Sequence, residues 1–105
     1  MSLVAEINKI DRQIKVIVRQ LSTENLSQAE KKALQQIKLG CNELKLDVRD
    51  YEYAETRAEQ LKWAKIAQHN LKAVETLVLQ NGTIFGPVDV AELSARIEDI
   101  RAKLI

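Results

Sequence analysis

His69 and Cys41 are the side chains most useful to an enzyme, and each type occurs only once in the 105 residues. A metal site needs several His, Cys or carboxylate ligands, and none stands three or four residues from His69. On a helical wheel His69 falls among lysines, which indicates an exposed histidine. Cys41 falls on an apolar seam, which indicates a small buried thiol with no base to activate it.

Three glutamates, Glu52, Glu55 and Glu59, lie close together in a polar stretch. Catalytic carboxylate pairs need two different environments across a cleft, whereas glutamates grouped on one helix are typical of a solvated face. A di-iron bundle needs Glu-x-x-His pairs on two helices, which one histidine cannot supply. The chain also lacks a Gly-rich phosphate loop and a Ser-His-Asp set. We therefore predict no enzyme activity, no cofactor, no metal and no small-molecule substrate.

The charge balance does not favour nucleic acid or an anionic membrane as a partner. The chain has 16 basic and 15 acidic residues, with a net charge of +1. The basic residues of one candidate helix scatter around the wheel and alternate with acids, whereas a nucleic-acid footprint is denser. They are Lys31, Lys32, Lys38, Lys45 and Arg49. A nucleic-acid-associated helical regulator remains the alternative function.

Location is indicated by what the sequence lacks. A single cysteine excludes an intrachain disulfide and suits a reducing compartment. The first twenty residues carry charges throughout and have no apolar core of a signal peptide. No apolar run approaches the roughly 20 residues of a membrane span. We expect a cytoplasmic protein that makes no membrane contact.

Helical periodicity covers most of the chain. Residues 3–21 carry an apolar seam with alternating spacings of four and three, and residues 89–104 carry a second one. Ser2 is the predicted N-cap of the first helix. The first seam comprises Leu3, Ile7, Ile10, Ile14, Ile17 and Leu21, and the second comprises Val90, Leu93, Ile97, Ile100 and Leu104. These two stretches are predicted to be amphipathic helices.

The central helix is predicted to begin at Ser27, which forms a capping box with Glu30. It then meets no strong stop before Asn81, so it would span about 54 residues, or roughly 80 Å. Its two halves carry apolar seams that differ by about 80° around the wheel. We favour one continuous helix that exchanges partners near residue 55, because residues 52–60 contain neither Gly nor Pro. A bend there, with the chain folding back, is the alternative.

The chain is predicted to turn at Asn81 and Gly82, where Gly82 would supply the left-handed cap of the central helix. The loop 83–87 follows, and the last helix is predicted to start near Asp89, which is placed for a capping-box-like contact with Glu92. The apolar loop residues Ile84 and Phe85 should be buried as a plug at the end of the helix pair.

The fold class is all-α. Short connections favour antiparallel neighbours, so the first helix should pack on the first half of the central helix and the last helix on its second half. We expect a single helical domain over residues 1–105, built as helical hairpins or a bundle on one long central helix with coiled-coil-like packing. It would have three helices, or four if the chain bends near residue 55.

The second half of the central helix has an apolar arc of roughly 180°, wider than one facing helix can cover. If the helix is straight, a second copy of the chain would cover the remainder, and a symmetric homodimer is the commonest solution. Asn70 lies near the centre of this arc, where it would either pair with its symmetry mate or bond to loop backbone or water. The predicted interface comprises Trp63, Ile66, Asn70, Val74 and Leu77.

Leu39, Leu46 and Tyr53 repeat every seven residues on a face away from the main seam. Single exposed apolar residues carry little meaning, but a seven-residue repeat aligns them along one helix. We interpret the row as a second seam for another chain. The predicted function is that of a protein–protein interaction module: a small oligomeric adaptor, regulator or assembly subunit that binds its own copies and another protein.

Overall fold

The computed structural model of the chain describes residues 3–20 and 26–104, and these residues form α-helices without any strand. The bundle measures 48 × 23 × 19 Å along its principal axes. Its helices are α1 (Leu3–Gln20), α2 (Gln28–Glu52), α3 (Arg57–Gln80), α4 (Gly82–Phe85) and α5 (Pro87–Lys103). The all-α prediction is confirmed. The chain adopts the predicted alternative with four long helices, and the short helix α4 is additional.

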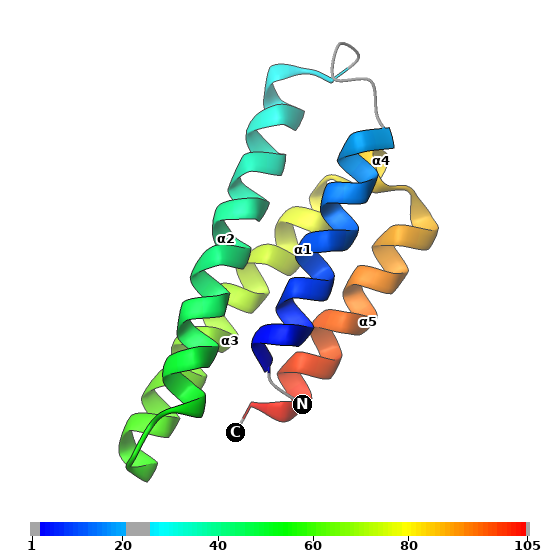
Figure 1. The fold of residues 1–105 in the computed structure, drawn as a ribbon. Coiled ribbons are helices and arrows are strands. Elements are labelled where there is room, and N and C mark those ends of the chain that lie inside the picture. Colours follow the sequence, from blue (N-terminus) through cyan, green and yellow to red (C-terminus); the bar gives the residue numbers. More distant parts are fainter. Residues whose placement is uncertain (1–2, 21–25, 105) are drawn as a thin grey trace.

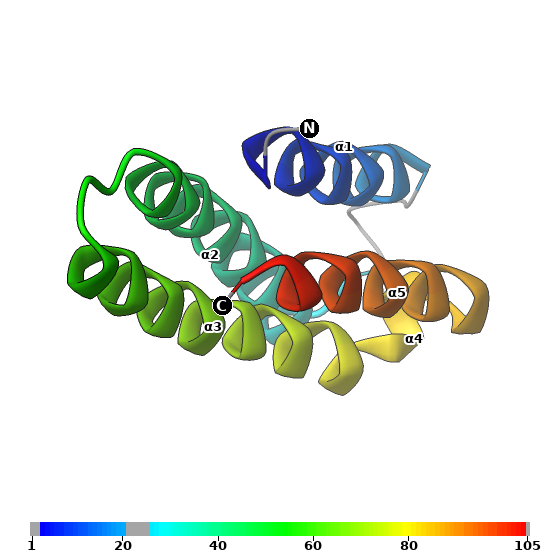
Figure 2. The ribbon, with the colours of Figure 1, turned by 90° about the horizontal axis from the view of Figure 1, so that it is seen from below.

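The four long helices run alternately up and down the bundle (Figure 1). Each long helix packs against the next one in chain order, and α5 also packs against α1, as the view from below shows (Figure 2). The predicted pairings of α1 with α2 and of α5 with α3 are both present. The most extensive contact is between α2 and α3, so a long helical hairpin forms one side of the molecule.

The prediction of a continuous central helix is wrong. α2 ends at Glu52, where the backbone N–H of the cap residue Tyr53 donates to the Arg49 carbonyl and the N–H of Ala54 donates to the Tyr51 carbonyl. α3 starts after Thr56, whose φ of −121° and ψ of 157° are extended and whose hydroxyl accepts a hydrogen bond from the Glu59 N–H at 3.1 Å. A capped end satisfies the orphan backbone groups, so the chain can turn here without Gly or Pro.

The fold-back merges the apolar seams into one core. The wide apolar arc of α3 is covered by α2 on one side and by α5 on the other. Both helices belong to the same chain, so no second copy is needed to cover the arc. A straight central helix would have left that arc in water, so burial of apolar area favours the bend. Among the fully buried side chains of this core are Ile7, Ile10, Ile37, Leu44, Leu71, Leu93, Ile97 and Ile100.

The start of α2 agrees with its prediction. The Ser27 hydroxyl accepts from the Glu30 N–H at 3.1 Å, and the Ser27 N–H donates to the Glu30 carboxylate at 3.0 Å, which completes the capping box. The proposed N-cap Ser2 and the last predicted residue of the first helix, Leu21, lie outside the described residues.

The connection after α3 differs from its prediction in three respects. Asn81 caps α3, but Gly82 opens the short helix α4 instead of taking a left-handed conformation. The glycine with positive φ, 81°, is Gly86. α5 then starts at Pro87, not near Asp89, since proline suits the first helical position and has no N–H to leave unpaired. Ile84 and Phe85 are buried, as predicted.

Candidate interaction surface

The residues with catalytic potential lie apart from one another. His69 is exposed on α3, and Glu52, Glu55 and Glu59 are exposed around the α2–α3 turn. Cys41 is buried, and its burial, together with the negative charge of Asp11, raises the pKa of the thiol to about 12. A thiol with that pKa stays protonated near neutral pH and is a poor nucleophile. Within the described ranges, no group of three or more His, Cys, Asp and Glu side chains is placed to hold a metal.

The basic residues of α2 do not form one surface. Lys45 turns inward, and its ammonium donates to the Asp11 carboxylate on α1 at 3.1 Å. Lys15 approaches the same oxygen at 3.3 Å. Burial by itself raises the pKa of Asp11, but the hydrogen bonds and charges of these two lysines outweigh it and hold that pKa below its usual range. Asp11 therefore stays ionised as an anchor between α1 and α2.

Asn70 has a partner within the chain that neither interpretation of the sequence named. Its side-chain amide donates to the carboxylate of Asp47 on α2 at 2.5 Å. Burial raises the pKa of Asp47, the bond from Asn70 opposes that rise, and the nearby Glu43 and Asp50 add to it. This polar contact lies at the outer edge of the packed surface between α2 and α3.

Val74 faces Gly40 where α3 packs closely on α2. A Cβ atom at Gly40 would lie only 2.8 Å from Cγ2 of Val74, so the absence of a side chain lets the two helices approach. Val74 is 1% exposed. The chain itself covers Val74, which leaves it unable to contact a second copy, and the area argument for a dimer across the whole arc no longer applies.

The seven-residue row on α2 remains in solvent. Leu39 is 56% exposed, Leu46 54% and Tyr53 77%. Gly40 and Asp47 both face α3, and Leu39 and Leu46 each precede one of them, about 100° around the helix. Lys45, which contacts α1, directly precedes Leu46, so the row is also about 100° from the side of α2 that faces α1. The row therefore follows the outer face of α2, away from both neighbouring helices.

The edge of α3 on the side of α2 carries further apolar residues. Trp63 and Leu77 stand seven residues before and after Asn70, and Ile66 lies between them in sequence; all three are half-buried. The Lys62 ammonium lies 5.1 Å from the centre of the Trp63 ring, a cation–π distance. We call the combined surface the hairpin face; it comprises Leu39, Leu46, Tyr53, Trp63, Ile66 and Leu77.

Sequence reasoning found every member of the hairpin face but missed Asp11 and Asp47 as polar contacts between helices. An aspartate next to an apolar seam, with a basic or amide side chain on a second helix, was the available hint. Which side chain meets it depends on how the helices pack.

No helix of the described chain is both long and apolar enough to cross a membrane. Comparison with protein-family models, with curated protein sequences and with solved structures gives no match to this chain.

Proposed function

We propose that the protein is a non-catalytic interaction module that binds protein chains through the hairpin face, with a second copy of itself as the first partner. The observation that carries this proposal is the exposed row of Leu39, Leu46 and Tyr53. The bundle core is complete without these side chains. A row of large apolar residues that the chain does not use for its own core is typical of a contact surface.

The row has the spacing of a helix–helix seam. At 1.5 Å per residue its members stand about 10 Å apart along α2, so the stripe is about 21 Å long. Trp63 on the adjoining edge of α3 is a large aromatic of the kind that anchors interfaces. The stripe is long enough for one helix of a partner to pack along it.

An antiparallel pair of α2 helices centred on Leu46 suits the row best. Leu39 of one copy then faces Tyr53 of the other, because both stand seven residues from the centre. A parallel pair would instead place Leu39 against Leu39 and Tyr53 against Tyr53, whereas the antiparallel twofold pair sets the larger side chain against the smaller one at both ends of the row.

Light scattering on the wild type and on Leu46→Glu tests the proposal. We expect the wild type to be a dimer at high micromolar concentration and Leu46→Glu to be a monomer with unchanged circular dichroism. Leu79→Glu is the matched control, because Leu79 is also 56% exposed but lies on the far side of α3. A monomeric wild type, or equal effects of the two substitutions, would contradict the proposal.

A further inference from the structure

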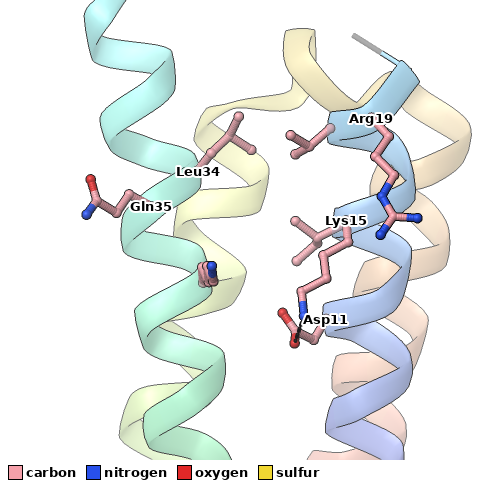
Figure 3. A pocket seen from close by; sticks show the side chains of 8 residues that line it. Asp11, Lys15, Arg19, Leu34 and Gln35 are labelled. Carbon is pink, nitrogen blue, oxygen red and sulfur yellow. Dashed lines mark ion pairs between the residues drawn. The ribbon is translucent and has the colours of Figure 1, made fainter. Parts of the chain in front are cut away.

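A hollow of about 480 Å³ opens between α1 and α2, near the end of α1 and the start of α2. It lies outside the hairpin face, because its lining residues belong to α1 and to the side of α2 that faces α1. Figure 3 shows Leu34 pointing from α2 toward α1, with Lys15 and Arg19 extending along α1. The volume falls in the range of small-ligand sites.

The floor of the hollow is aliphatic. Ile14 is buried, and Val18 and Leu34 are half-buried partners of the core. All three line the hollow. Water over such a floor makes few hydrogen bonds, so a hydrocarbon group that displaces it gains free energy.

The rim of the hollow is cationic. Lys15 and Arg19 come from α1 and Lys38 from α2, against the single carboxylate of Asp11. Asp11 already has Lys15 and Lys45 as its ion-pair partners. Among the residues that the structure describes, Arg19 and Lys38 have no ion-pair partner, so the rim carries an excess of positive charge.

We propose that this hollow binds a single-chain amphiphile with an anionic head group, of the fatty-acid type. The hydrocarbon chain lies on Ile14, Val18 and Leu34, and the carboxylate lies between Arg19 and Lys38. Both walls are α-helices whose backbone groups are bonded within the helix, so an extended peptide would find no partners for its own N–H and C=O groups. A hydrocarbon chain has no such groups to satisfy.

Calorimetric titration with hexanoate, octanoate and decanoate, each below its micelle concentration, tests the proposal. We expect one site per chain and about a fourfold fall in Kd for each added methylene, as buried CH₂ groups give. Decyltrimethylammonium is the control for charge, and it should bind at least tenfold more weakly than decanoate. Equal binding of the two amphiphiles, or no dependence on chain length, would overturn the proposal.

Variants locate the site. Arg19→Gln with Lys38→Gln should weaken decanoate binding by at least tenfold, whereas Lys62→Gln with Lys65→Gln, two exposed changes on α3, should leave it unchanged. Val18→Thr keeps the shape of the floor but adds a hydroxyl, and should weaken binding severalfold while circular dichroism stays the same. Equal effects of the two double variants on decanoate binding would contradict the assignment. So would binding of a short acidic peptide in place of decanoate.

Discussion

Two contact surfaces of α2 differ in how closely the helices approach. Against α3, Gly40 lets Val74 pack directly onto the backbone, and the side-chain amide of Asn70 on α3 donates to the carboxylate of the buried residue Asp47. Against α1, the helices separate toward one end and leave a hollow of about 480 Å³. The tight surface leaves room for a partner only on its outer face, whereas the open surface leaves room between the helices.

The two surfaces also treat a buried aspartate in opposite ways. Asp11, between α1 and α2, meets two lysines, and its pKa is lowered despite burial. Asp47, between α2 and α3, meets a neutral amide, and its pKa is raised by burial and by neighbouring acids. A charge is held where cations reach it and is disfavoured where only a dipole does. The open surface therefore carries an ion pair between its helices, from Lys45 to Asp11, whereas the tight surface carries a hydrogen bond from a neutral amide.

Gly40→Leu should give the largest effect, because it forces atoms into the tight surface. The new Cβ would lie 2.8 Å from Val74, whose branched side chain has little freedom to move. We expect a net loss of about 1–3 kcal/mol in the free energy of unfolding, even after the gain in helix propensity. Urea denaturation gives the value.

Gly82→Ala is the matched control for Gly40→Leu. A Cβ at Gly82 would stand 3.7 Å from Val90, an ordinary contact. Its stability should be unchanged or higher by up to about 1 kcal/mol. If Gly40→Leu were as stable as this control, the two surfaces would not differ in tightness.

The two aspartates should respond differently to the same substitution at neutral pH. Asp11→Asn removes the charge that Lys45 and Lys15 share, and should lower the free energy of unfolding by about 1.5 kcal/mol. Asp47→Asn keeps an acceptor for Asn70 and removes a disfavoured charge, so its stability should change by less than about 0.5 kcal/mol in either direction. Equal losses in urea denaturation would show that the two contacts are of one kind.

The smallest effects are differences in pH dependence. Because the folded-state pKa of Asp11 is lowered, its stabilisation is present above the unfolded pKa of about 3.9 and is lost as pH falls through the folded value. The deficit of Asp11→Asn relative to wild type should therefore shrink in acid. Because the folded-state pKa of Asp47 is raised, its protonated form stabilises the fold at low pH, and that contribution is lost as pH rises through the folded value.

The free energy of unfolding of Asp47→Asn should accordingly rise relative to that of the wild type as pH rises from strongly acid toward neutral. That of Asp11→Asn should fall relative to the wild type over the same range. Urea denaturation of the three proteins across that range measures both trends. Parallel curves for all three would mean that neither carboxyl group has a shifted pKa.

Helices and their buried faces were predictable because they depend on near neighbours in the chain. The Ser27 capping box, the seam from Ile7 to Ile14 and the burial of Phe85 follow from spacing and residue type. The turn at Tyr53–Thr56 was only the alternative to a continuous helix, although Thr56 and Glu59 have the spacing of a helix start. That local preference is weak, and it prevails only because folding back covers the apolar arc of α3.

The exposed row of Leu39, Leu46 and Tyr53 was also predictable, because its seven-residue repeat and its angle from the main seam can be read from one helix. Whether a partner covers it remains a proposal. Val74 was assigned to the same kind of surface for the same reason, but it packs against Gly40 and is buried. Periodicity identifies an apolar face without identifying which helix covers it.

By itself, therefore, the sequence determined where the helices lie and which of their faces are apolar, since propensity, capping and periodicity act over a few residues. Tertiary structure decided that Asp11 meets Lys45, that Asp47 meets Asn70, and that α1 and α2 separate over Leu34. The two aspartate contacts join residues 34 and 23 positions apart. They depend on how closely four helices pack around one core, which is set by side-chain volumes on all of them together.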